Sequence, residues 1–411
     1  MDVLKEFFRN GRLLTLALGH FMVDSYVGLL PVMFPLLIHR FDLNLRTVGL
    51  VTLAYTGMGA VSQPVFGLVA DRWGTRFTGL ALAWTAISFA AAGFAPSFPI
   101  LVGIALLSGI GSGTFHPLGA VTVRSLLPPR GLNMAMSLYV TAGTLGLAAG
   151  PLIGVAVFGL AGIKGTALML LPGVLIAAYL VLAMRSRAYA VPRGPRRRVA
   201  AAGALPLIPL AATVGVMASR SWTTVALQAF TPTWYQHLGY QPWFYGPLAT
   251  TIILASAMGA VGTGALADRY GRRAVIVGTM VMSVPAVWLF AAFPGVQGFL
   301  WAVLVGSLAA STAPLMLVLA QELLSARAGL ASGLIMGLGF VTGAIGVPVT
   351  GAIADRFGIQ AALFSQVLVV LITIPVALLL PSEPFLARLR EREAAPVERK
   401  VELAHAGGGG S

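Results

Sequence analysis

The chain has 411 residues, of which 57% are hydrophobic and 10% are charged. This composition excludes a soluble globular protein and indicates a membrane protein with many spans, since one span needs roughly 20 apolar residues to cross about 30 Å of hydrocarbon. The formal net charge of +14 does not indicate nucleic-acid binding, because the basic residues are scattered over short loops instead of forming one face. The absence of cysteine excludes disulfides, thiolate metal sites and cysteine nucleophiles.

Loop residues divide the chain into twelve predicted transmembrane helices. They cover residues 12–38, 46–70, 77–94, 98–124, 131–158, 163–184, 205–236, 242–267, 274–293, 297–321, 328–354 and 359–380. The first is predicted to be a retained helix and not a signal peptide, because it is long, contains Asp24 and lacks a small-residue cleavage site. The sequence therefore predicts an all-α membrane protein of two pseudo-symmetric six-helix halves.

The predicted organisation is an N-terminal half at 1–184, a basic linker at 185–203, a C-terminal half at 204–380 and a charged tail at 381–406, before an appended glycine-serine stretch at 407–411. Most lysines and arginines fall on the side of the N-terminus, the linker and the tail. The opposite loops hold only Arg40, Arg46, Lys164 and Arg356. The positive-inside rule therefore places both termini in the cytoplasm, for a protein of the inner membrane.

A sequence repeat relates the two halves. The segment "GLVADRWGTR" at Gly67–Arg76 recurs as "GALADRYGRR" at Gly264–Arg273, and Arg220 matches Asp24 at nearly the same offset. Agreement at several points makes chance a poor explanation. Two halves related in this way describe a transporter whose site lies near the midplane between them.

The repeated element and the basic linker resemble the major facilitator superfamily. Three further segments resemble its fosmidomycin-resistance family of drug efflux transporters: "GHFMVDSYVGLLPVMFPLL" (19–37), "GIGSGTFHPLGAVTVR" (109–124) and "LVLAQELLSARAGLASGLIMGLGF" (317–340). The matches lie in both halves, so the resemblance covers essentially the whole chain up to the tail. It implies the major facilitator fold and proton-driven export across the inner membrane, and it leaves the substrate open.

Asp24 is the strongest candidate for proton coupling. At the helical rise it lies about 18 Å beyond Arg12, near the middle of the bilayer. A carboxylate there costs roughly a few kcal/mol or more unless it is paired, hydrated or protonated. We predict that Asp24 carries the coupling proton, the alternative being a permanently hydrogen-bonded structural residue. His20, one turn earlier on the same face, is predicted to relay the proton or to serve as a neutral interhelical donor.

Three further residues are candidates for the substrate site. Arg220 stays charged, so it is predicted to pair with Asp24 or to hold an anionic substrate, a purely structural salt bridge being the alternative. His116 precedes the helix-bending Pro117 and is predicted to face a cavity, in proton coupling or substrate binding, or else to hold two helices together. Trp222, two positions from Arg220, is the best aromatic candidate for lining the cavity.

Glu322 and a set of small and charged residues are predicted to act in coupling or gating. Glu322, near the cytoplasmic end of its helix, either receives protons or, preferably, pairs with Arg327 or Arg124. The predicted gating residues are Gly67, Asp71, Arg72, Gly74, Arg76, Gly264, Asp268, Arg269, Gly271, Arg273, Gly146, Gly150, Pro151 and Gly154. The last four lie in "GLAAGPLIG", which resembles the superfamily's antiporter signature. A further "ADRFG" at 354–358 falls on the outer side and is given no inner-loop role.

The leading interpretation is a proton-coupled efflux antiporter for small amphiphilic or anionic compounds, fosmidomycin-like phosphonates among them, working by alternating access. Proton symport of an organic anion is an alternative, since the same residues would serve it. An enzyme or receptor is disfavoured because the sequence has no H-E-x-x-H, G-x-S-x-G or P-loop motif and no soluble output region. The expected partners are a small-molecule substrate, protons and the lipid bilayer, without cofactor, metal or nucleic acid, for a chain that works as a monomer.

Overall fold

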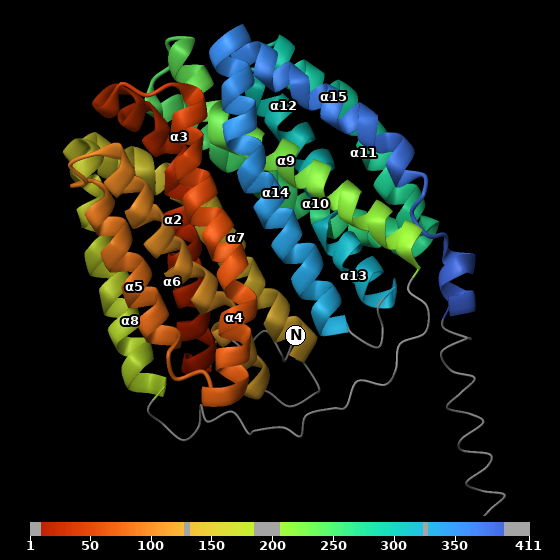
Figure 1. The fold of residues 1–411 in the computed structure, drawn as a ribbon, viewed down its shortest axis with the longest axis horizontal. Helices are drawn as coiled ribbons and strands as arrows, with labels where there is room; N and C mark the ends of the chain where they lie inside the picture. Colours follow the sequence, from red (N-terminus) through yellow and green to blue (C-terminus); the bar gives the residue numbers. More distant parts are fainter. Residues whose placement is uncertain (1–9, 127–131, 185–205, 324–327, 390–411) are drawn as a thin grey trace, which may run out of the picture.

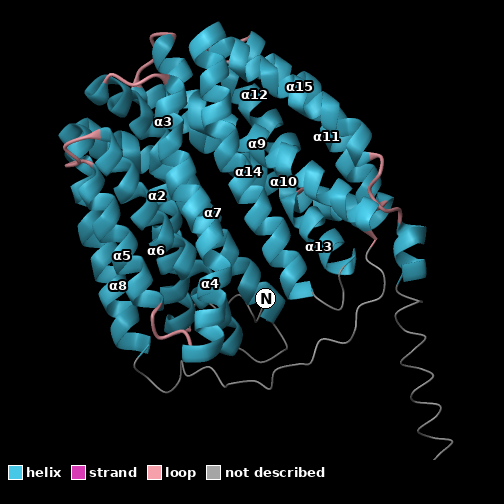
Figure 2. Cartoon of the chain, in the orientation of Figure 1, coloured by secondary structure: helices cyan, strands magenta, loops and turns pink. Residues whose placement is uncertain are grey.

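The computed structural model describes residues 10–126, 132–184, 206–323 and 328–389. Over these ranges the chain folds into helices and connecting turns, with no strand (Figure 2). The predicted linker at 185–203, and the part of the predicted tail beyond residue 389, lie outside the described ranges.

The helices follow the predicted order closely. The N-terminal half contains α2 (Gly11–Phe41), α3 (Leu45–Thr52), the π-helical turn η1 (Leu53–Gly57), α4 (Met58–Trp73), α5 (Thr78–Ala92), α6 (Phe98–Ser125), α7 (Leu132–Ala161), the 3₁₀ segment η2 (Gly162–Met169) and α8 (Leu170–Met184). The C-terminal half contains α9 (Leu207–His237), α10 (Pro242–Tyr270), α11 (Arg272–Ala292), α12 (Gly298–Val305), the π-helical turn η4 (Gly306–Ala310), α13 (Ala313–Leu323), α14 (Ala328–Phe357) and α15 (Ile359–Ala377).

The prediction of an all-α protein with twelve spans in two halves is confirmed for the described residues. α3 with η1 and α4 forms one span, and so does α12 with η4 and α13, which gives six spans to each half. Eight helical stretches of the described chain are long and apolar enough to cross a membrane by length and composition, and one of them, Leu138–Met184, joins two predicted spans. Figure 1 shows the two halves side by side, the first half on the left and the second on the right.

The glycine of the repeated "DR-x-G" element ends a helix. Gly74, Gly271 and Gly358 follow α4, α10 and α14 with φ of +78°, +82° and +86°. Residues with a Cβ rarely adopt this backbone conformation, so the element needs glycine at this point. The third copy, for which the sequence suggested no inner-loop role, therefore terminates its helix in the same way as the other two.

Helices α2 and α7 are in near-backbone contact. A Cβ added to Gly146 of α7 would collide with the carbonyl oxygen of Phe21 in α2, and one added to Gly150 would collide with Gly28. The opposite side of α7 meets the other half, where the Thr250 hydroxyl of α10 donates to the Ala148 carbonyl at 2.7 Å. The predicted span 5 motif thus lies at a junction. Its glycines pack against α2, and the opposite side of α7 contacts the C-terminal half.

The two ends of the bundle differ in how the halves meet. We call the end where α8 stops and α9 starts the linker end, and the end with the α2–α3 and α14–α15 connections the far end (Figure 1). At the far end, Asp355 accepts the backbone N–H groups of Leu45 and Arg46 at 2.7 and 2.9 Å. A Cβ on Gly49 would lie 3.0 Å from the Cα of Pro348. The N-terminus of α3 is therefore capped by a carboxylate from the opposite half, which closes the far end.

Replacement of Asp355 by asparagine is expected to weaken this closure. The amide lacks the negative charge that the helix N-terminus favours and keeps only one acceptor oxygen, at a cost of about 1 kcal/mol, or roughly fivefold in the ratio of closed to open far ends. Spin labels on cysteines introduced at Phe94 and Phe357, both exposed, would measure the distance between the halves. Asp42→Asn at the same end is the matched control, and equal distance distributions for both variants would contradict the assigned cap.

Candidate functional site

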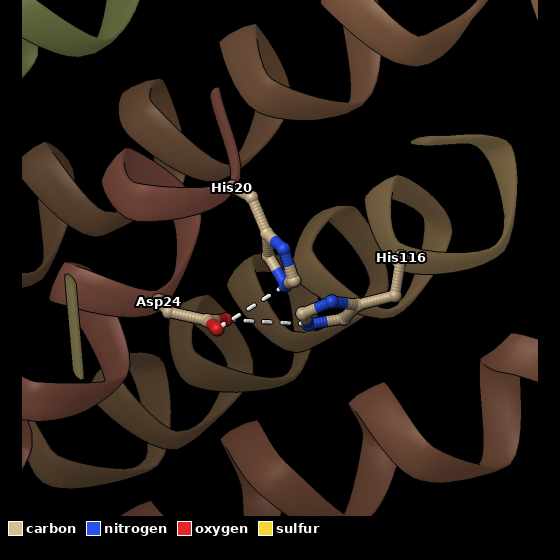
Figure 3. Close-up of side chains that lie close together, drawn as sticks. All are labelled: His20, Asp24 and His116. Carbon is tan, nitrogen blue, oxygen red and sulfur yellow. Dashed lines mark ion pairs between the residues drawn. The ribbon is translucent and has the colours of Figure 1, made fainter. Parts of the chain in front are cut away.

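Three of the predicted polar residues meet in the N-terminal half. His20 and Asp24 lie one turn apart on α2, and His116 reaches them from α6 (Figure 3). The Nε2 atom of His20 lies 3.3 Å from Asp24 Oδ2, and the Nε2 atom of His116 lies 3.4 Å from Asp24 Oδ1. We call His20, Asp24 and His116 the proton cluster.

The hydrogen-bond partners of His20 determine where a proton must lie. Its Nδ1 atom is 2.9 Å from the backbone oxygen of Tyr139, and since a carbonyl oxygen only accepts, Nδ1 carries a hydrogen. A neutral His20 beside an ionised Asp24 would then point a lone pair of Nε2 at a carboxylate oxygen. One further proton relieves this repulsion, either as an imidazolium beside the carboxylate or as a carboxylic acid beside a neutral imidazole. The His20–Asp24 pair therefore has a place for one exchangeable proton.

Tyr139 and Gly143 of α7 shape the proton cluster. Neither residue belongs to a predicted site. The ring of Tyr139 stacks on His20 with centroids 4.3 Å apart. A Cβ on Gly143 would lie 2.5 Å from Asp24 Oδ2 and 2.6 Å from His20 Nε2. Gly143 thus leaves the room that the two side chains occupy. The available signal was the small-residue stripe of Gly146 and Gly150, which Gly143 extends by one turn.

Replacement of Gly143 by alanine is expected to disturb coupling more than folding. The added methyl group meets the ends of two side chains, which can rotate away, instead of meeting the backbone. Proton-driven transport by the variant should fall about tenfold or more, while its thermal stability stays within roughly 1–2 kcal/mol of the native protein. Transport in vesicles and melting in detergent measure the two quantities. A variant with native proton coupling would show that the proton cluster tolerates displacement.

A cavity of about 490 Å³ opens beside the proton cluster. Its described lining comes from α2, η1, α4, α6 and α7, together with Phe340 of α14. Apolar side chains and uncharged polar ones both occur in this described lining, and no lysine or arginine is among them. Gln63, Ala120 and Met136 line it on the stretches of α4, α6 and α7 that lead to the linker end. The cavity therefore runs from the middle of the bundle toward the linker end.

A metal ion is not needed to explain the proton cluster. The ligand atoms of its three residues lie within 4.8 Å of one another, close enough by distance alone for an ion. A proton between His20 and Asp24 satisfies the same atoms, and the Nε2–H tautomer of neutral His116 can donate to the remaining carboxylate oxygen. The sequence expectation of no metal and no cofactor remains a prediction.

Arg220 and Trp222 lie apart from this cavity, in the C-terminal half. Arg220 is buried and donates from Nη2 to the Leu308 carbonyl at 2.5 Å. Leu308 belongs to the π-helical turn η4, whose irregular backbone makes a carbonyl available to a side chain. Trp222 donates to the Thr350 hydroxyl at 2.9 Å. Neither residue lines the 490 Å³ cavity, and the pairs formed by the described residues do not include Asp24 with Arg220.

Glu322 lies at the linker end, outside the proton cluster. Both of its oxygens contact Arg272 of α11 at 2.9 Å, and Glu383 lies 3.8 Å from Arg272 Nε. The two partners expected from the sequence are not open to the same test, because Arg327 lies outside the described residues and the side chain of Arg124 is not described. Arg272 belongs to the repeated element, so this ion pair ties the element to the end of α13.

Replacement of Glu322 by glutamine is expected to lower stability and to leave proton coupling intact. The paired contact with Arg272 is only partly exposed, and loss of its charge costs about 1–2 kcal/mol. The melting temperature in detergent should fall, while cargo-driven proton flux in vesicles should remain near the native rate. Loss of flux from a well-folded variant would instead assign Glu322 to the proton path.

The predicted gating residues fall into separate groups. Gly74 and Gly271 end helices, as described above, and Arg273 donates to the Leu378 carbonyl. Arg76 and Arg269 lie over the neighbouring rings of Phe77 and Tyr270. Added Cβ atoms on Gly67 and Gly264 would meet no described atom within 4 Å, so the described helices make no close approach at these two glycines. The side chains of Asp71 and Arg72 are not described, and Asp268 is exposed.

The fold and the site together are those of a membrane transport protein. Two six-helix halves that meet at the far end, with a polar cluster and a cavity leading to the linker end, form the architecture of a secondary transporter. The family model described as Major Facilitator Superfamily matches residues 16–263 and 223–406. The chain belongs to the major facilitator superfamily, whose members are transporters and not enzymes.

Two curated relatives match over most of their length. The uncharacterized MFS-type transporter YfnC of Bacillus subtilis is 30% identical over 402 residues, which cover 92% of this chain and 94% of the relative. The fosmidomycin resistance protein of Escherichia coli is 30% identical over 369 residues, which cover 85% of this chain and 88% of the relative. The resemblance to the fosmidomycin-resistance family is therefore confirmed.

Solved structures confirm the fold. A bacterial homologue of the human lysosomal transporter Spinster, in an inward-facing and occupied conformation, aligns with a TM-score of 0.77 at 16% identity, covering 91% of this chain and 97% of that one. A D-xylose–proton symporter aligns with a TM-score of 0.72 at 16% identity, covering 90% and 97%.

Proposed function

We propose that this transporter is a proton-coupled efflux antiporter that exchanges a small amphiphilic molecule for a proton at the proton cluster. The observation that carries the proposal is the place for one exchangeable proton between His20 and Asp24, beside a cavity of suitable size for a small molecule. His116, on the other oxygen of Asp24, is the second member of the relay. A group that gains and loses a proton next to the cargo is the minimum that coupling requires.

Export is the proposed direction of transport. The excess of lysine and arginine in the loops of the linker end supports a cytoplasmic location for that end and for both termini, in the inner membrane. The far-end closure through Asp355 and the cavity at the linker end then correspond to a state that receives cargo from the cytoplasm. The relative named for fosmidomycin resistance supports removal of a toxic compound from the cell.

Coupling by exchange accounts for the transport cycle. Cargo that enters from the cytoplasm releases the proton inward, and rocking of the halves then opens the far end and breaks the Asp355 cap. Outside, a proton replaces the cargo and the halves return. The interhalf contacts at Ala148 and Thr250 lie on the moving interface, which supports a gating role for the span 5 motif.

The sign of proton movement tests the proposal. Purified protein would be placed in liposomes that hold a pH-sensitive dye, and a panel of amphiphiles with fosmidomycin would be added outside. Antiport predicts alkalinisation of the lumen as cargo enters, because protons leave in exchange. Acidification would instead establish proton symport, the alternative that the sequence left open. Protein-free liposomes and a protonophore provide the controls, and no pH change with any compound would contradict proton coupling.

A further inference from the structure

We propose that the cargo is a lipophilic cation, an amine whose ammonium group replaces the shared proton at Asp24. This inference rests on the proposed antiport and specifies its substrate class. Asp24 is the one carboxylate among the described residues that line the cavity, and no lysine or arginine stands beside it there. The described lining of the cavity therefore offers a negative group to an occupant and no permanently positive side chain.

The two histidines do not turn the cavity into an anion site. Each directs its Nε2 atom toward an oxygen of Asp24, at 3.3 and 3.4 Å, so the positive charge of a protonated histidine is neutralised inside the cluster. His20 also donates its Nδ1 hydrogen to the Tyr139 carbonyl, so this hydrogen is not available to an anion. An anion in the cavity would meet the carboxylate without a compensating cation, at a high cost in an apolar setting.

Arg220 does not supply the missing positive charge. Its guanidinium is buried in the C-terminal half, donates to the Leu308 carbonyl and is absent from the lining of the cavity. The interpretation of Arg220 as a holder of anionic cargo therefore has no support from the geometry of this state. A structural role, in which Arg220 links α9 to the π-helical turn between α12 and α13, fits its contact better.

The walls of the cavity fit the rest of such a molecule. Val27, Leu147 and Phe340 provide apolar surface, and the aromatic side chains of Tyr55 and Tyr139 also belong to the lining. The Tyr139 hydroxyl is buried and has no hydrogen-bond partner among the described groups. An ammonium has up to three N–H donors, and the carboxylate oxygens of Asp24 can accept from it. These features describe an aromatic or aliphatic body with a basic nitrogen at one end.

Competition at one carboxylate couples cargo binding to proton release, and no other coupling residue is needed. The titratable groups that face Asp24 are His20, His116, Tyr55 and Tyr139. The proton that the ammonium displaces is the one shared between His20 and Asp24, since an ammonium beside the carboxylate takes the same place. Because raising the pH removes the competing proton, it tightens binding of the cation, until the amine itself loses its charge. Binding of a neutral compound of the same shape has no such dependence.

Matched compounds separate this inference from the antiport proposal. A naphthylalkyl primary amine, the corresponding alcohol and the corresponding phosphonate would be titrated into the detergent-purified protein by calorimetry at several pH values. The amine is expected to bind about tenfold or more tightly than the alcohol, and its affinity to rise by up to about tenfold per pH unit. Asp24→Asn should abolish the preference for the amine and keep the affinity for the alcohol. The pH series on the native protein keeps the test decisive if the variant does not fold.

The contradicting results differ for the two proposals. Tighter binding of the phosphonate than of the amine, together with proton flux driven by the phosphonate in liposomes, would overturn the cationic substrate class and retain antiport. Asp24-dependent binding of the amine without proton flux for any compound would retain the cation site and overturn antiport. Equal affinity for the amine and the alcohol at every pH would overturn the inference by itself.

Discussion

Replacement of Asp24 by asparagine is expected to abolish proton-coupled transport and to preserve the fold. Asparagine has nearly the same shape, its oxygen can accept from His116, and its amide N–H can donate to the Nε2 atom of His20. The cluster therefore stays satisfied without an exchangeable proton. Accumulation driven by a pH gradient in liposomes should fall to the background of protein-free vesicles, while exchange of a neutral analogue persists at a rate that does not depend on pH.

Glu322→Gln is the matched control for this substitution. It makes the same change of a carboxylate to an amide, but at a residue paired with Arg272 at the linker end. If both variants lose proton flux to the same extent, the loss reflects charge removal in general and the assignment of Asp24 fails. If Asp24→Asn keeps native flux, Asp24 is a structural residue and the coupling proton resides elsewhere.

Replacement of Gly146 by alanine is expected to have the largest effect on stability. The added Cβ would collide with the backbone of Phe21. The carbonyl carbon and the Cα of Phe21 would lie only 2.7 and 2.8 Å from it. A backbone cannot rotate aside as a side chain does, so α2 must move away from α7, at a cost of about 3 kcal/mol or more. We expect poor expression in the membrane or a much lower melting temperature, measured by fluorescence-detected size exclusion.

Gly154→Ala on the same helix is the control for Gly146→Ala. Its Cβ would lie 3.4 Å or more from the side chains of Phe158 and Val32, an ordinary contact distance. Both glycines fit the span 5 pattern of spaced small residues. In the structure, only Gly146 packs directly against the backbone of α2. Equal melting temperatures for the two variants would show that the α2–α7 contact has room to relax.

The sequence predicted the architecture because apolar length and loop residues are local signals. The bounds of α6, for example, are Phe98–Ser125 against a predicted span of 98–124. His20 and Asp24 were placed on one face because helical spacing alone requires it. His116 was expected at a cavity from its setting beside Pro117, and the structure brings it to Asp24.

The sequence did not predict the contacts that depend on packing between distant helices. Tyr139 and Gly143 carry no charge and acquire their roles only because α7 lies against α2. The carbonyl that binds Arg220 is supplied by a π-helical turn, which residue propensities do not reveal. The motif that contains Asp355 falls at the far end, where the sequence indicates no inner-loop role. In the structure, Asp355 caps a helix of the other half.

In the proposed transport cycle, cargo and a proton compete at the proton cluster. The most direct test is the number of protons released when cargo binds, obtained by calorimetry in buffers of different ionisation enthalpy, with the compound that drives the largest flux in liposomes. Competition predicts that the native protein releases close to one proton per bound molecule at pH values where the affinity rises about tenfold per pH unit, and that Asp24→Asn releases none. Binding by the native protein that releases no proton at any pH would show that cargo and proton do not compete.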